Sequence, residues 1–334
     1  MKKVGFVLWM LLSFQSQAQW TLIWNDEFDG NTLDNSKWTK DIGGNGWGNN
    51  EAQYYTDSPT NFSMANGEAT FTARAEQFST NQYTSAKITT KGKFNVKYGK
   101  IEGRMKIPQG QGLWPAFWML GSNIDQMTWP TCGEIDVMEH INNETKVHGT
   151  AHWDNVGHQY WGGTIDNDPT QYHTYTIIWD SLKVKWYMDD IIYYQLNIAN
   201  GVNGTEEFQL PFYLLLNLAV GGNWPGYPNG TTVFPAEMVV DYVRVYTYDA
   251  NAGIATEGTP EYTLSPNPVG NQLYLNTEKI VSYRINSIDG KMHDEASISK
   301  GTEFIDVTQL APGNYLLEIE TIHSKKSIVR FVKQ

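Results

Sequence analysis

Residues 133–140 read Gly-Glu-Ile-Asp-Val-Met-Glu-His and pack three acids among three large apolar side chains. Successive side chains of a β-strand point to opposite faces, so a strand here places Glu134 and Asp136 on one face. In a regular strand Glu139 would point the other way. One extra residue, a β-bulge at Val137-Met138, would return Glu139 to the face of the other two acids. The stretch therefore predicts a bulged strand with three acids on one side.

Three neighbouring carboxylates repel one another, so one should hold its proton near neutral pH while another stays ionised. A retaining glycosidase needs such a pair, a carboxylate nucleophile and a protonated acid roughly 5–5.5 Å apart. Acids alternating with apolar residues also occur in any half-exposed strand. Trp114, Trp118 and Trp129 lie close before the acids. Indole rings suit the apolar faces of sugars, although a tryptophan on its own is more often a core residue.

Polar and apolar residues alternate over many short stretches up to about Tyr248. We expect strands at 69–75, 98–107 and 183–188, and a hairpin turn that leads into a strand at 191–195. No helical period persists for more than a turn or two. The pattern predicts an all-β, two-sheet antiparallel sandwich.

The two ends of the chain differ from its middle. Residues 1–18 combine a basic start, an apolar run and small residues at the end, which is typical of a secretory signal peptide. Residues 249–260 resemble a linker, and residues 261–334 form a small alternating all-β unit without tryptophan. No other stretch approaches the roughly 20 apolar residues of a transmembrane helix.

The formal net charge of -12 argues against nucleic acid or an anionic membrane as a partner. It also disfavours a strongly sulfated polysaccharide as the substrate. Cys132 is the single cysteine, so no intrachain disulfide can form, and we expect a buried free thiol. We expect a monomer.

Two strings carry a resemblance to a known family. Residues 112–120 (GLWPAFWML) and 129–139 (WPTCGEIDVME) look like glycoside hydrolase family 16, and within it the laminarinase-type endo-β-1,3-glucanases. The two residues between Asp136 and Glu139 match the bulged form of that motif. The resemblance covers about residues 20–248 and implies a β-jelly roll with a concave substrate cleft, which gives a catalytic domain at 19–248.

The resemblance also implies roles. Glu134 would be the nucleophile, Glu139 the acid and then the base, and Asp136 would polarise Glu134 and raise the pKa of its neighbours. No cofactor is implied for catalysis. The residues that would contact the sugar are Trp114, Trp118, Trp129, Arg104, Asn49, Glu51, His152, Asn217 and Trp224.

A structural Ca²⁺ is implied by the same likeness. Glu27, the Gly67 carbonyl and Asp241 match a calcium site that the family carries on its convex face. Carboxylate and carbonyl oxygens are the hard ligands that Ca²⁺ prefers. Such acids are also commonly just solvated.

The C-terminal unit resembles the type IX secretion sorting domain of Bacteroidetes, through residues 264–268, 289–291, 310–315 and 331–333. This implies export through the type IX machinery, to the medium or the cell surface. The sequence thus predicts a secreted retaining endo-hydrolase of β-1,3-glucan. The alternatives are a non-catalytic glucan-binding protein, the same chemistry on mixed-linkage β-1,3-1,4-glucan or algal galactan, and transglycosylation.

Overall fold

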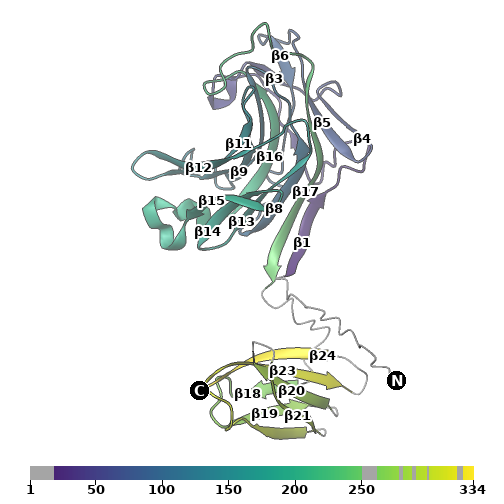
Figure 1. Cartoon of the computed structure of the whole chain (residues 1–334). Coiled ribbons are helices and arrows are strands. Elements are labelled where there is room, and N and C mark those ends of the chain that lie inside the picture. The colour runs from purple at the N-terminus through teal and green to yellow at the C-terminus, as the bar shows by residue number, and fades with distance from the viewer. Residues whose placement is uncertain (1–18, 250–261, 278–280, 288–290, 299–300, 322–325) are drawn as a thin grey trace, which may run out of the picture. The chain divides into compact units, whose positions relative to one another are not determined.

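The computed structural model describes residues 19–249, 262–277, 281–287, 291–298, 301–321 and 326–334. The predicted signal peptide and nearly all of the predicted linker lie outside these residues. The chain divides into two compact units, one of which is Trp20–Tyr248 and the other of which contains the C-terminal residues. Figure 1 draws the first unit in purple to green and the second in yellow-green to yellow.

The first unit contains an eight-stranded antiparallel sheet, here called the outer sheet. Its strand order is β15-β14-β13-β8-β17-β5-β4, with β1 also paired to β17. The strands are β1 (Gln19–Asp26), β4 (Phe62–Ala65), β5 (Glu68–Ala73), β8 (Gly99–Lys106), β13 (His173–Trp179), β14 (Lys183–Met188), β15 (Ile191–Asn197) and β17 (Ala236–Asp249).

A seven-stranded antiparallel sheet, the cleft sheet, has the order β12-β11-β10-β9-β16-β7-β2. Its strands are β2 (Thr39–Lys40), β7 (Lys87–Thr89), β9 (Leu113–Gly121), β10 (Glu134–Glu139), β11 (Lys146–Asp154), β12 (His158–Asp166) and β16 (Phe212–Val220). A parallel pair, β3 (Gln53–Tyr55) and β6 (Tyr83–Ser85), and three short 3₁₀ helices, η1 (Gly46–Gly48), η2 (Ala199–Gly204) and η3 (Glu206–Gln209), complete the elements described for this unit.

One apolar core joins the two sheets. It contains buried residues of the outer sheet, such as Ile101 and Val243, and of the cleft sheet, such as Phe117 and Leu216. The sheets approach each other closely at Gly103 of β8, where an added Cβ would lie 3.0 Å from a ring carbon of Phe117. The predicted sandwich is therefore confirmed, with one face of the cleft sheet turned to the core and the other left open.

The strands predicted from alternation are present with small differences at their ends. Strand β14 matches residues 183–188, and β15 runs two residues beyond the predicted 191–195. Strand β5 ends at Ala73, two residues before the predicted end. Arg74 there makes only an isolated bridge with Thr84.

The second unit forms two small antiparallel sheets in the order β18-β19-β22 and β21-β20-β23-β24. Its own core contains Leu273, Ile285, Leu317 and Phe331. The described part of the chain contains no helix long and apolar enough to cross a membrane. The strands are β18 (Tyr262–Ser265), β19 (Gln272–Thr277), β20 (Val281–Ser287), β21 (Met292–Ile298), β22 (Gly301–Asp306), β23 (Gly313–Thr321) and β24 (Lys326–Lys333).

Truncating Phe117 tests the contact between the sheets. We expect Phe117→Ala to lower the free energy of unfolding by about 3–5 kcal/mol, because it removes a fully buried ring. Denaturant unfolding followed by tryptophan fluorescence reports on the first unit alone, since every tryptophan lies at or before Trp224. The control is Phe78→Ala, at a ring that is 46% exposed. Equal losses in the two variants would contradict this account of the core.

Candidate active site

The bulge in β10 is present where the sequence predicts it. Against β11, Asp136 pairs with Thr150 and Glu139 with His148, so two residues of β10 face the single Gly149. The register against β9 also shifts between Asp136 and Met138. The bulge prediction is therefore confirmed.

Because the two bulged residues are buried between the sheets, the side chain of Glu139 points to the open face of the cleft sheet. Val137 and Met138 are both fully buried in the core between the sheets. Glu134 and Glu139 line one cavity of about 800 Å³ on the open face of the cleft sheet, here called the cleft. Asp136 lies between them in the strand and is 2% exposed. The three acids thus share one side of β10.

Tryptophans form much of the wall of the cleft. Alternation along β9 turns Trp114 and Trp118 into the cleft and Phe117 into the core. Trp224 packs edge-on against Trp114, with ring centroids 5.5 Å apart. Trp129 is 44% exposed and stands beside the ring of His158, at 4.5 Å. Indole faces therefore border the acids from several sides.

Electrostatics within this group favour protonated acids. Burial, followed by the charge of Asp136, raises the pKa of Glu139 to about 8. Burial, again with Asp136, raises the pKa of Glu134, while His152 and the indole of Trp129 oppose that rise. Burial also raises the pKa of Asp136 well above its usual range. The site therefore disfavours full ionisation of the three carboxyl groups at neutral pH.

His152 lies beside two of the acids. Its Nε2 is 3.2 Å from Asp136 Oδ2 and 3.7 Å from Glu134 Oε1. The other ring nitrogen, Nδ1, is 2.9 Å from Nε2 of His158. The imidazole is therefore held between an acidic pair and a second imidazole. Burial and the charge of His152 lower the pKa of His158, which disfavours a proton on both nitrogens of the His158 ring.

Trp114 and Trp118 are oriented by hydrogen bonds of their indole nitrogens. Trp114 Nε1 donates to Glu139 Oε1 at 2.9 Å, which leaves Oε2 as the oxygen that can carry the proton. Trp118 Nε1 donates to Asn217 Oδ1 at 2.7 Å. Asn217 in turn donates to the Tyr55 hydroxyl at 3.2 Å.

A loop pair closes one end of the cleft. The backbone NH of Asn223 donates to the Asn49 carbonyl at 2.8 Å, and the side chains of Asn50 and Asn223 bond at 2.9 Å. Gly222 has a φ of +131°, and an added Cβ would come within 3.3 Å of the Asn49 carbonyl. The two loops therefore pack through backbone contacts that a side chain at Gly222 would disturb.

The family model of glycosyl hydrolases family 16 matches residues 47–244, which contain the acids, the bulge and most of the cleft wall. The chain belongs to this family. The model of a secretion system C-terminal sorting domain matches residues 263–334. The catalytic unit is therefore a glycoside hydrolase that carries an export address, and the protein is secreted or placed at the cell surface.

Similar proteins agree with this assignment. A beta-glucanase of Rhodothermus marinus is 38% identical over 275 residues, covering 74% of this chain and 95% of that protein. The clotting factor G alpha subunit of Tachypleus tridentatus is 41% identical over 235 residues, but the match spans 69% of this chain and only 34% of that subunit. The laminarinase catalytic domain of Thermotoga maritima has 44% identity and a TM-score of 0.65, covering 68% of this chain and 98% of that domain.

Arg104 is not where the family likeness places it. It lies in β8 of the outer sheet, forms an ion pair with Asp241 and stacks on the ring of Tyr172. Its prediction as a sugar contact is wrong, because the core between the two sheets separates β8 from the cleft. Alternation indicates which face of a strand a residue occupies, but not which sheet the strand joins.

The predicted calcium ligands already have other partners. Both carboxylate oxygens of Glu27 accept bonds from Arg244, at 2.9 and 2.7 Å, and the Asp241 carboxylate pairs with Arg104. A calcium ion there would have to displace two guanidinium groups, so the donor set does not fit as it stands. The Gly67 carbonyl stays an untested third ligand. Calcium binding here stays a prediction, and these contacts argue against it.

Glu51 and Asn217 act behind the cleft wall. Asn217 is 7% exposed, and neither residue lines the cavity. Glu51 Oε2 accepts bonds from Gln53 at 2.5 Å and from the Tyr55 hydroxyl at 3.2 Å. The two residues are thus linked through Tyr55 and orient Trp118, which differs from the direct sugar contact predicted for them. Asn49, Trp114, Trp118, Trp129, His152 and Trp224 do line the cavity, as Glu134 and Glu139 do.

Several residues of the cleft wall are absent from the sequence prediction. Lys87 is the most unusual, since its ammonium lies 4.4 Å from the ring centre of Trp47 and 5.1 Å from that of Trp118. The sequence signal that could have indicated Lys87 is a lysine between two apolar residues in a short strand. The other unpredicted lining residues are Leu120, His148, Thr150, His158, Tyr160, Gly162, Gly163 and Thr164. Cys132 is buried and free, as predicted, and burial raises its pKa to about 11.

The raised pKa of Glu139 makes protein stability depend on pH. The pKa of the Glu139 carboxyl is higher in the folded state than in the unfolded state. Its contribution to stability is fully present when the pH is below the pKa of the unfolded state, and it is lost as the pH rises through the folded-state pKa of about 8. We therefore expect Glu139→Gln to be more stable than the wild type at pH 9, by on the order of a few kcal/mol, and little different at pH 4. Denaturant unfolding at both pH values measures this, and a difference that is the same at both would contradict it.

Proposed function

We propose that this glycoside hydrolase cleaves β-1,3-glucan of the laminarin type within the chain, with retention of anomeric configuration. The observation that carries the proposal is the bulge in β10, which puts Glu134 and Glu139 on one face of the cleft with Asp136 between them. The relatives named as beta-glucanase and laminarinase support the choice of glucan.

The first step is a displacement at the anomeric carbon. The Glu134 carboxylate attacks that carbon and forms a glycosyl ester, while Glu139 gives its proton to the departing glycosidic oxygen. A pKa of about 8 keeps Glu139 protonated at neutral pH, as this role requires. The indole of Trp114 holds the carboxyl group in place from the other oxygen.

The second step returns the enzyme to its starting state. Glu139, now a carboxylate, takes a proton from water as the water oxygen attacks the ester, and Glu134 leaves as a carboxylate. Burial raises the pKa of Asp136, which favours its protonated form, and a protonated Asp136 beside Glu134 would donate a hydrogen bond to that carboxylate. A carboxylate oxygen of Asp136 lies within 4.8 Å of a carboxylate oxygen of Glu134.

The C-terminal unit and the assembly state complete the proposal. The sorting-domain match supports recognition by a type IX secretion machinery. The catalytic unit contains the acids and the cleft wall within one chain, which supports action as a monomer.

Product analysis tests the substrate. We expect the wild type to release reducing ends from laminarin faster than from lichenan or agarose, with Glu134→Gln inactive on all three. If the wild type and Glu134→Gln are equally inactive on laminarin and both still bind it, the protein binds glucan without cleaving it. Faster release from lichenan or agarose would assign the mixed-linkage or galactan alternative, and products longer than the substrate would show transglycosylation.

Azide rescue separates the roles of the two glutamates. Glu134→Ala and Glu139→Ala should each lower activity on an aryl β-glycoside of a β-1,3-linked gluco-oligosaccharide by about 10²–10⁴-fold or more. Azide replaces the missing nucleophile in Glu134→Ala and gives an α-glycosyl azide. In Glu139→Ala azide attacks the glycosyl ester and gives a β-glycosyl azide. The opposite stereochemistry, read by NMR, would exchange the two assignments.

The pH profile tests the acid. We expect kcat/KM on laminarin to fall as pH rises above about 8, because Glu139 then loses the proton that the leaving oxygen needs. An aryl substrate whose leaving group needs no proton serves as the control, since its first step should lack this alkaline decline. A decline of the same size for both substrates would contradict the role of Glu139.

A further inference from the structure

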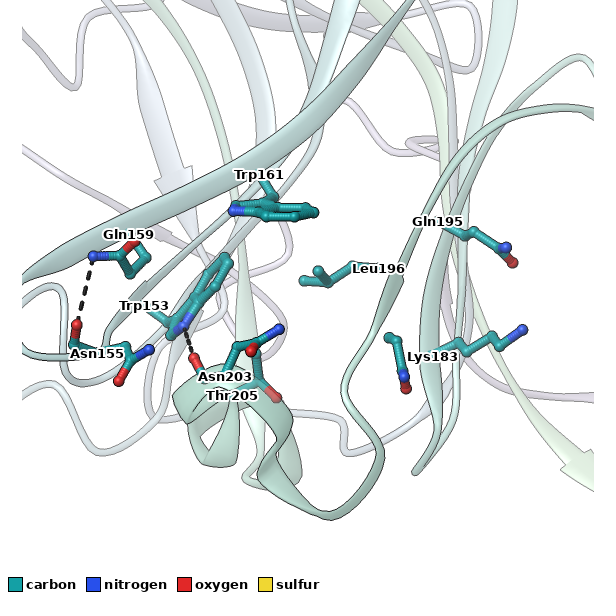
Figure 2. Close-up of a pocket in the computed structure, with 10 residues that line it drawn as sticks. Trp153, Asn155, Gln159, Trp161, Lys183, Gln195, Leu196, Asn203 and Thr205 are labelled. Carbon is teal, nitrogen blue, oxygen red and sulfur yellow. Dashed lines mark hydrogen bonds between the residues drawn. The ribbon is translucent and has the colours of Figure 1, made fainter.

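A second cavity of about 670 Å³ lies away from the acids, between neighbouring edges of the two sheets. It is bordered by β11 and β12 of the cleft sheet, by β14 and β15 of the outer sheet, and by η2. Figure 2 shows Trp161 and Trp153 on one side, Leu196 entering from β15, Asn203 of η2, and Thr205 directly after η2.

The lining of this cavity has the chemistry of a sugar site. Trp161 is 56% exposed, and among the described residues its indole nitrogen has no hydrogen-bond partner. Carboxamides, which both donate and accept, supply most of the polar groups, and no carboxylate lines the cavity. These amides are Asn155, Gln159, Gln195, Asn197 and Asn203. Figure 2 shows Gln159 and Asn203 on the side of the cavity that carries the two tryptophans, while Gln195 and the charged Lys183 extend away from Trp161. An open indole face with amides on its side of the cavity suits a ring that has apolar faces and hydroxyl edges.

Strand β12 connects this cavity to the cleft. His158, Tyr160 and Thr164 line the cleft, whereas Gln159 and Trp161 line the second cavity, as expected for alternating residues. Strand β12 is the edge of the cleft sheet. A polysaccharide that leaves the cleft past Tyr160 therefore reaches a sheet edge whose other face carries Trp161.

The cavity is already shaped in this structure. Trp153 is 2% exposed, and its Nε1 donates to the Asn203 carbonyl at 2.9 Å, which fixes η2 against β11. Gly163 lets β12 approach β15, since an added Cβ there would lie 2.7 Å from the Cβ of Tyr194. The wall that carries Trp161 is thus held on both sides by packing contacts.

We propose that this cavity is a second, non-catalytic binding site for a neutral glucan, in which a sugar ring stacks on Trp161. The choice of glucan as the ligand rests on the proposed function. The site would hold a distant part of the same long chain that the cleft cleaves, or a neighbouring chain of the same polysaccharide. Such a site should matter for long substrates and not for short ones.

Fluorine NMR of the 5-fluorotryptophan-labelled Glu134→Gln protein tests the binding directly. The Trp161 resonance is identified by its loss in Trp161→Phe. We expect laminaritetraose to shift this resonance along a saturating curve that is separate from that of Trp129 in the cleft. The inference is overturned if Trp161 stays unmoved at concentrations well above those that saturate the cleft resonances.

Kinetics provide the second measurement. We expect Trp161→Ala to raise the KM for laminarin about tenfold, since an indole face is lost from an apolar contact, and to leave the KM for laminaritetraose unchanged. Trp161→Phe should recover part of the loss. The matched control is Ile191→Ala, at an exposed apolar residue of β15 outside both cavities. Equal effects of Trp161→Ala on both substrates would overturn the inference.

The two proposals can fail separately. A wild-type protein that releases no reducing ends from laminarin overturns the proposed function. A wild-type protein that hydrolyses laminarin, while its Trp161 resonance does not respond to laminaritetraose, overturns only the second site.

Discussion

Three carboxyl groups share one buried patch, and the free-energy cost of negative charge there governs the arrangement around them. Burial is the largest cause of the raised pKa values of Glu134, Asp136 and Glu139. The bulge makes that crowding unavoidable, because it sends Val137 and Met138 into the core and leaves Glu139 no other face. Packing of two apolar side chains thus fixes the position of the proton donor.

Cationic and indole groups offset part of this cost. Lys87 is 8% exposed, and its ammonium lies against the rings of Trp47 and Trp118 with Asp41 Oδ2 at 3.6 Å. Burial lowers the pKa of Lys87, while the charges of Asp41, Glu51 and Glu134 raise it. The lysine therefore adds a positive charge at one side of the acids and stiffens the two indole platforms beside it.

Sequence reasoning succeeded where one strand is enough to fix a position. The three acids and the paired tryptophans of β9 follow from alternation and one bulge, and the described strands confirm both. It failed where the answer depends on pairing between distant strands. Arg104 alternates correctly in β8, yet β8 pairs with β13 and β17 in the outer sheet. Lys87 could not be predicted as a cleft residue for the same reason, because β7 joins the cleft sheet through its pairing with the distant strand β16.

Strand β12 shows how backbone packing can position function on two faces at once. An added Cβ at Gly162 would lie 2.5 Å from the Gly149 carbonyl, and one at Gly163 would meet Tyr194, so the strand lies tightly against its neighbours at these glycines. Tyr160 and Trp161 precede them immediately and must stand on opposite faces of the same edge. Close packing at two residues without side chains therefore fixes one aromatic ring in the cleft and the next in the second cavity.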